Sequence, residues 1–250
     1  MSTTVLLFTI LPDDNGSALF LYVCQFFDVI TLNKVGIMQI DHLVIFCSPG
    51  AQEVELLNAF GLHDGAARSH TGQGTASRCF FFGNCYLELL FVEDEVALRS
   101  AATRVTRLAE RFLQSNSNTS PFGVCFKQPD AALATLAYHP EFLPQGYRLT
   151  LARHNPLSEP LWFFLQTPDG ELPPFQRQTF NWQSELHQLT AVNMTIAEGS
   201  NLSPTAKAVM AHSCIELFAD ITPLMELTFD HGAQRQSHDF RPALPLLLRW

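Results

Sequence analysis

The stretch 40–92 most constrains the fold of this chain, because its apolar residues change their spacing several times. Residues 40–47 (IDHLVIFC) have the pattern of a strand, and residues 49–62 have the pattern of a helix. A short strand then leads through a glycine-containing loop into a hairpin, formed by residues 76–82 and 85–92 around a Gly-Asn turn. The predicted order is therefore β-α-β-β-β.

The remainder of the chain is predicted to repeat this plan. A long helix over about 94–116 links a first module, about 38–98, to a second half, about 120–250. The strands predicted in that half cover 122–127, 147–153, 161–167, 189–196, 214–219, 224–230 and 243–250, and its helices cover 130–138 and 203–212. The last stretch again has the β-α-β-β-β order, which indicates an internal repeat of structure with little repeat of sequence.

Composition narrows the class of protein. Of the 250 residues, 47% are hydrophobic and 16% are charged, which supports a packed core and argues against disorder. The net charge of -9 would repel a nucleic acid, so that class of partner is excluded. The chain has 21 phenylalanines, which fit either core packing or the walls of an apolar cavity.

Six cysteines lie scattered along the chain, and none is part of a CxxC pair. Several stand within apolar runs, where a reduced cysteine behaves as a small hydrophobic residue. With no secretion signal in view, we expect free thiols in a reducing, cytoplasmic compartment and no membrane partner. These cysteines are Cys24, Cys47, Cys79, Cys85, Cys125 and Cys214.

Residues 1–37 are an N-terminal extension of uncertain status. Their apolar run 18–32 is interrupted by Asp28 and is shorter than a membrane-spanning helix needs. Either the natural product starts at Met38, just before the strand at 40–47, or the extension adds a strand or helix over the core. A folded unit over 38–250 is expected in both cases.

Four stretches together resemble a known family. They are 40–45 (IDHLVI), 70–90 (HTGQGTASRCFFFGNCYLELL), 121–126 (PFGVCF) and 238–250 (HDFRPALPLLLRW). Over about residues 38–250 the chain resembles the glyoxalase-like branch of the vicinal oxygen chelate superfamily. The resemblance implies an α+β fold, in which paired βαβββ modules curl mixed sheets around a central cleft. Members often pair modules between two chains, so a homodimer is one expected arrangement.

The resemblance also implies a ligand set. Many members bind a divalent metal through a His of the first strand and a Glu of the fourth, which here are His42 and Glu88. Alternation along the two strands puts both side chains on one face, where they either hold Zn²⁺, Fe²⁺, Mn²⁺ or Ni²⁺ or hydrogen-bond one another. Glu226, in Met-Glu-Leu, resembles Glu88, in Leu-Glu-Leu, and is the expected third ligand. Ala191, at the position that matches His42, cannot bind a metal.

Four further residues are expected to contact the substrate. His70 and Thr75 belong to the glycine loop 70–76, whose glycines permit close approach to a ligand. Arg78 begins an apolar strand and requires a carboxylate partner, from either the protein or the substrate. Tyr86 shares a strand face with Glu88.

Two classes of function follow from these residues. The first is a metal-dependent lyase, isomerase or dioxygenase that acts on a small oxygenated substrate, with Glu88 as a ligand or as a catalytic base. The second is a metal-free protein of the bleomycin-resistance type, which binds or sequesters a small molecule. The content of bound metal distinguishes the two.

Overall fold

The computed structural model describes residues 10–12, 18–20, 38–113, 118–168, 185–197 and 201–250. The chain divides into two compact units, Met1–Val35 and Gly36–Trp250. In the first unit, β1 (Ile10–Pro12) and β2 (Ala18–Phe20) form an antiparallel hairpin. Most of the apolar run 18–32 lies outside the described residues, so a start of the natural product at Met38 stays a prediction. None of the described helices is long and apolar enough to cross a membrane.

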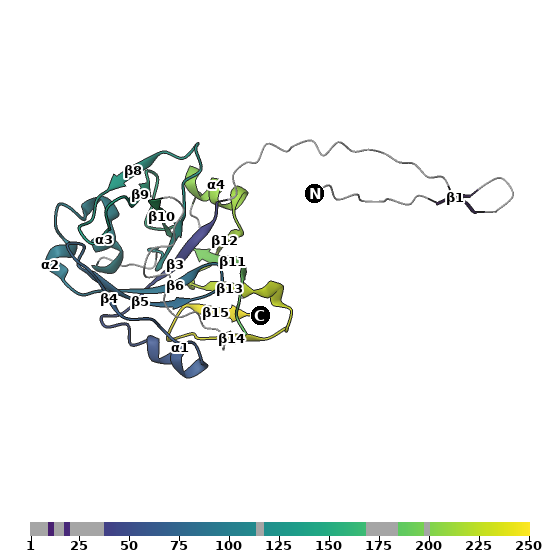
Figure 1. The fold of residues 1–250 in the computed structure, drawn as a ribbon, viewed down its shortest axis with the longest axis horizontal. Coiled ribbons are helices and arrows are strands. Elements are labelled where there is room, and N and C mark those ends of the chain that lie inside the picture. Colours follow the sequence, from purple (N-terminus) through teal and green to yellow (C-terminus); the bar gives the residue numbers. More distant parts are fainter. Residues whose placement is uncertain (1–9, 13–17, 21–37, 114–117, 169–184, 198–200) are drawn as a thin grey trace. The chain divides into compact units, whose positions relative to one another are not determined.

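The second unit contains two sheets and a few short helices (Figure 1). The α+β class predicted from the sequence is confirmed. The elements up to the long central strands are β3 (Ile40–Phe46), α1 (Val54–Phe60), β4 (Arg68–His70), β5 (Thr75–Phe81), β6 (Tyr86–Val92), α2 (Glu95–Leu98), η1 (Arg104–Thr106) and α3 (Leu108–Leu113). The others are β7 (Phe122–Phe126), β8 (Thr135–Tyr138), β9 (Arg148–Ala152), β10 (Leu161–Gln166), β11 (Leu189–Ile196), α4 (Pro204–His212), β12 (Ile215–Ala219), β13 (Met225–Phe229), η4 (Asp230–Gly232), β14 (Ser237–Asp239) and β15 (Leu246–Arg249).

The larger sheet has eight strands in the order β4-β5-β6-β3-β7-β10-β9-β8. Its two halves meet at the antiparallel pair β3–β7, and each half places its first and fourth strands side by side in parallel. The paired modules predicted from the sequence are therefore present. Their second member, however, is β7–β10 and not the last stretch of the chain, and no described helix lies between β7 and β8.

The central strands are apolar on both faces because both faces are covered. One face of β3, with Leu43 and Ile45, belongs to the main core, which also contains Phe229 and Leu246 of the smaller sheet. The other face, with Val44, belongs to a second cluster around Leu90, Leu108 and Leu151 (and related apolar residues). A strand of this kind reads as a continuous apolar run, so a polar side chain within it stands out.

The smaller sheet has five strands in the order β12-β11-β13-β15-β14. In it β11 pairs with β12 in parallel and with β13 in antiparallel, so its connectivity differs from that of the first module. Helix α4 ties this part to the larger sheet at both ends: Ser203 donates to Glu159, and His212 bonds Asp130 at 2.7 Å. The order of strands and helix predicted for residues 189–250 is therefore largely present, but these strands pair differently from those of the first module.

The prediction of one long helix over 94–116 is also wrong. The chain instead makes three short turns of helix, α2, η1 and α3, and residues 114–117 lie outside the described part. The Thr103 hydroxyl donates to the Leu98 carbonyl at 2.7 Å, and Arg107 adopts a left-handed conformation with φ 56°. A polar side chain that competes for helical carbonyls and a left-handed residue both end a helix.

The helix predicted over 130–138 is a turn followed by β8. The Asp130 carboxylate accepts from the Ala132 amide at 2.8 Å, which starts a turn. Leu136 and Tyr138 then pair with Leu151 and Leu149 of β9. The helix propensity of Ala and Leu is outweighed here by strand pairing at the edge of the sheet.

Candidate active site

A cavity of about 350 Å³ opens on the face of the larger sheet that carries Val44. It lies within the usual size range of small-molecule pockets. The lining residues come from both halves of the sheet, from α3 and from the loop after β8. They are His42, Val44, Phe46, Arg68, Ser69, His70, Gln73, Tyr86, Glu88, Leu90, Thr106, Leu108, Tyr138, Phe142, Leu143, Pro144, Leu149, Leu151, Leu161, Phe163 and Leu165.

His42 is held in one orientation by the residue before it. Its Nδ1 lies 2.7 Å from Oδ1 of Asp41, and both side chains are buried. Strict alternation would have placed Asp41 on the opposite face of the strand, as the sequence predicts, but the pairing of β3 with β7 shifts register between Ile40 and His42. A carboxylate at Nδ1 accepts its proton, so the lone pair is left on Nε2.

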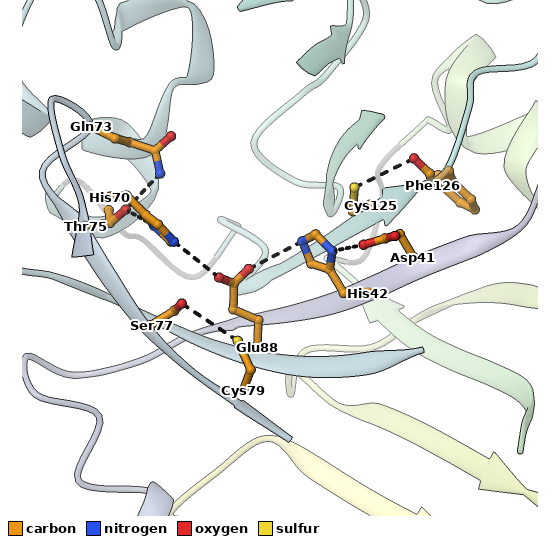
Figure 2. Close-up of polar contacts among 10 residues, drawn as sticks. All are labelled: Asp41, His42, His70, Gln73, Thr75, Ser77, Cys79, Glu88, Cys125 and Phe126. Carbon is orange, nitrogen blue, oxygen red and sulfur yellow. Dashed lines mark hydrogen bonds and ion pairs between the residues drawn. The ribbon is translucent and has the colours of Figure 1, made fainter. Parts of the chain in front are cut away.

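Glu88 lies between two imidazoles (Figure 2). Its Oε2 is 3.4 Å from Nε2 of His42, and its Oε1 is 3.8 Å from Nε2 of His70. The Glu88 side chain is buried, and strand β6 carries it beside Val44 of β3. The structure therefore brings together His42, Glu88 and His70, three residues that the sequence analysis named.

His70 is oriented from the glycine loop. Its Nδ1 lies 2.9 Å from Oγ1 of Thr75, which also accepts from the Gln73 amide at 2.8 Å. The ring of Phe142 lies over the imidazole, with centroids 4.7 Å apart. Burial lowers the pKa of His70, and the negative charge of Glu88 opposes that shift only in part. The lowered pKa favours the neutral ring at neutral pH.

Thr75 itself is fully buried and does not line the cavity. It supports His70 and does not face a substrate. Tyr86 does line the cavity, and its ring stacks on His42 with centroids 4.4 Å apart and an angle of 21° between the planes. Burial raises the pKa of the Tyr86 phenol well above its ordinary value, so the group stays protonated.

Two predicted site residues lie elsewhere. Arg78 pairs with Asp64, which supplies from the protein the carboxylate that its position requires, and it is not among the lining residues. Glu226 belongs to β13 of the smaller sheet, where it accepts from Arg249 at 3.0 Å and from Asn193 at 3.2 Å. The structure therefore does not join Glu226 to His42 and Glu88, because the Met-Glu-Leu stretch that resembles Leu-Glu-Leu at Glu88 lies in a sheet of different connectivity.

The glycine loop packs against the backbone of the protein itself. At Gly74, where φ is +81°, a side chain would collide with the backbone of Asp94 and Leu98. The Gly74 carbonyl accepts from the amides of Glu93 and Asp94. Close approach at this glycine therefore fastens the start of α2 to the loop that carries His70, where the sequence analysis expected close approach to a ligand.

A second cluster of metal-ligating atoms lies on the other side of the His42 ring. Ligand atoms of Asp41, His42 and Cys125 are within 4.8 Å of one another, and all three residues are buried. Burial raises the pKa of the Cys125 thiol well above its usual range, so the thiolate that metals prefer is disfavoured. The Asp41 contact also occupies Nδ1, the atom of His42 on this side.

The second half of the sheet contributes residues that the sequence analysis did not name. Leu149, Leu161 and Phe163 line the cavity opposite Glu88. The parallel pairing of β7 with β10 sets Cys125 beside Phe163, just as the pairing of β3 with β6 sets Val44 beside Glu88. The sequence predicts the strand over 161–167, but apolar side chains in a strand are equally typical of an ordinary core and do not indicate a cavity wall.

Comparison with known proteins identifies the family of this chain. A sequence model described as "Glyoxalase-like domain" matches residues 40–211, more than half of the chain. The chain belongs to the glyoxalase-like domain family. It is thereby a member of the vicinal oxygen chelate superfamily, as its sequence motifs predict. The family match ends within α4 and so does not include Glu226.

One solved structure shares the fold of this chain over most of its length. A hypothetical protein from Staphylococcus aureus is similar over 85% of this chain and 99% of its own, with 14% identity and a TM-score of 0.52. A Streptomyces coelicolor methylmalonyl-CoA epimerase variant, in complex with 2-nitronate-propionyl-CoA, covers 55% of this glyoxalase-like chain and 100% of its own, with 20% identity. Its TM-score of 0.38 is too low to bear on substrate or mechanism. No curated protein sequence matches the chain.

Proposed function

We propose that this glyoxalase-like protein is a divalent-metal-dependent enzyme, a lyase, isomerase or dioxygenase that acts on a small oxygenated substrate. His42 and Glu88 are the proposed ligands, with His70 beside them, and Glu88 is also the proposed catalytic base. The observation that carries the proposal is the contact between His42 Nε2 and Glu88 Oε2, at 3.4 Å inside a walled cavity.

This contact joins two electron-pair donors. Asp41 holds the proton of His42 on Nδ1, so Nε2 presents a lone pair. An ionised Glu88 also presents only lone pairs. Two such atoms that face each other away from water require a cation between or beside them, either a proton or a metal ion. Bulk water has little access to these two facing atoms and cannot relieve their repulsion, since His42 is 5% exposed and Glu88 is 7% exposed.

The donor set fits a first-row divalent ion. Two imidazoles and one carboxylate form the ligand set of many Zn²⁺ sites and of Fe²⁺ sites with open positions. His70 is available for this role because its lowered pKa keeps it neutral. Such an ion would supply a Lewis acid that polarises a carbonyl or enolate oxygen of the substrate.

The chain's own residues supply the remaining functions. Glu88 presents one carboxylate oxygen to each imidazole, so it can accept a proton from the substrate while the other oxygen stays paired. The rings of Tyr86 and Phe163 pack against His42, with centroids 4.4 Å and 5.3 Å away, and fix its plane. The apolar walls keep water from the reacting atoms.

The metal-free binding protein remains the second candidate, and one observation favours it. The second half of the sheet lines the cavity with Leu161, Phe163 and Leu165, none of which can bind an ion. All proposed ligands therefore come from one half. A cavity with this lining would also suit a protein that sequesters an apolar molecule.

Metal content separates the two candidates. Purified protein, loaded with Zn²⁺ or Mn²⁺ and then gel-filtered, is expected to carry close to one ion per chain by elemental analysis. His42→Ala and Glu88→Gln are expected to carry almost none. The matched controls are His154→Ala and Glu216→Gln, which alter exposed residues outside the cavity and should retain the ion. Wild-type protein that retains no ion would overturn the enzyme proposal and leave the binding protein.

A further inference from the structure

We infer that the molecule bound in this cavity carries an uncharged apolar tail, held by β8, β9, β10 and the loop 142–144. The inference rests on the proposed function only for the placement of the polar head group. It concerns the cavity walls that β8, β9, β10 and the loop 142–144 supply, which adjoin His42 at Phe163 and His70 at Phe142.

The lining residues with charged side chains all come from one half of the sheet, although that half also supplies the apolar Val44, Phe46 and Leu90. The first half of the sheet and its glycine loop supply the polar lining residues, among them His42, Glu88, His70 and Gln73. On the other side, the tail subsite has one hydroxyl and no charged side chain among its described residues. The tail subsite consists of Tyr138, Phe142, Leu143, Pro144, Leu149, Leu151, Leu161, Phe163 and Leu165.

These apolar side chains leave space where a structural role alone would close it. Leu149 and Phe163 are half-buried and border a cavity of about 350 Å³, whereas neighbouring Trp162 and Phe164 are fully buried. Protein interiors are normally packed to the density of organic crystals, and apolar surface left in contact with water is costly. A cavity with such walls is stable when an apolar ligand completes the packing.

Size and charge define the ligand class. At about 30 Å³ for each heavy atom, the volume that a water molecule takes in the liquid, the whole cavity holds roughly a dozen heavy atoms, head group and tail together. Among the described lining residues, the Arg68 guanidinium is the one permanent positive charge, and it comes from β4 beside His70. A charged tail would lose its hydration beside Leu149 and Phe163 with no counter-charge, so the tail must be neutral, either aliphatic or aromatic.

The tail subsite can be tested without knowledge of the natural substrate and without metal. Straight-chain 1-alkanols from butanol to dodecanol are titrated into metal-free protein and followed by calorimetry. Affinity is expected to rise about fourfold for each added methylene and to level off once the cavity is full. Triethylene glycol, which is neutral and similar in length to octanol but polar throughout, should bind far more weakly.

Leucine-to-glutamine variants assign the effect to the subsite. Leu149→Gln and Leu143→Gln should weaken octanol binding about tenfold, because each places an amide in the path of the chain. Leu143 lies in a loop, so its replacement leaves the sheet intact. Leu56→Gln is the matched control, since Leu56 is 39% exposed on α1 and is not among the lining residues.

The outcomes remain distinct from those of the metal test. Affinity that does not depend on alkanol length, or that is equally lowered by Leu56→Gln, would overturn the tail subsite even if the protein binds zinc. A length-dependent series in a protein that retains no ion would support the tail subsite and contradict only the proposed enzyme.

Discussion

The two halves of the eight-stranded sheet have the same strand order but different chemistry. In the first half, β3 and β6 present His42 and Glu88 to the cavity, and both residues are buried and paired. In the second half, β10 presents Leu161 and Phe163 to the same cavity. At the centre, β7 places Gly123 and Cys125 beside Val44 and His42.

This difference shows how the two halves of a duplicated architecture can take different roles. A cleft between two similar halves provides two sets of inward-facing positions. Here one set carries groups that bind charge and move protons, and the other carries groups that exclude water and shape the cavity. Because backbone pairing fixes where each position points, a change of side chain alone is enough to alter its role.

Replacement of Asp41 by Asn tests whether the polar half works as a unit, and it has the largest expected effect here. A carboxylate at the distal nitrogen of a metal-binding imidazole fixes its orientation and strengthens it as a ligand. Asp41→Asn should therefore weaken zinc affinity by roughly 10–100-fold, measured by competition with a chelator. Cys125→Ala should leave the affinity unchanged. An equal loss in Cys125→Ala would place the ion in the Asp41, His42 and Cys125 cluster.

Truncation of Phe163 tests whether the apolar half is independent of the polar half. Phe163→Ala should lower the free energy of unfolding by about 1–2 kcal/mol, because this side chain is only half-buried, whereas Phe164→Ala on the other face should cost about 3–5 kcal/mol. Urea denaturation measures both values. Zinc affinity of Phe163→Ala should fall by less than about tenfold, because Phe163 packs against the His42 ring but supplies no ligand atom. If Phe163→Ala loses the ion, the two halves are not separable.

Replacement of Glu226 by Gln has the smallest expected effect. Its ion pair with Arg249 lies at the surface, with the two side chains 19% and 47% exposed. Pairs of this kind contribute less than about 1 kcal/mol. Glu226→Gln should therefore change stability by less than that amount and leave the zinc content as it is. A loss of bound zinc would restore Glu226 to the ligand set and would contradict the assignment of the site to one half of the larger sheet.

The sequence predicts the first module well because the signals there are local. Alternation along β3, the helical spacing in α1 and the Gly83-Asn84 turn each depend on a few neighbouring residues. The same alternation placed His42 and Glu88 on one face, and parallel pairing of β3 with β6 brings them together. The prediction of these elements needed no information about residues outside the first module.

Other features depend on contacts between distant residues. The shift of register before His42 requires β7, and the strand at β8 requires β9, so neither is visible in the local pattern. The choice of partner for the first module was also beyond the sequence pattern. Two later stretches contain enough strands to serve, and only pairing between β3 and β7 selects the one that ends at β10. The contact of His70 with Glu88 joins two separate elements and is invisible in the local pattern, so the sequence suggested only a contact of His70 with substrate.

The most direct test of the account is a crystal structure of the protein soaked with Mn²⁺, with data collected for anomalous scattering. We expect one strong anomalous peak in the cavity, within ligand distance of Nε2 of His42 and of the Glu88 carboxylate, with His70 adjacent. A peak beside Cys125 or Glu226, or no peak in this cavity, would contradict the central claim that one half of the sheet holds the metal.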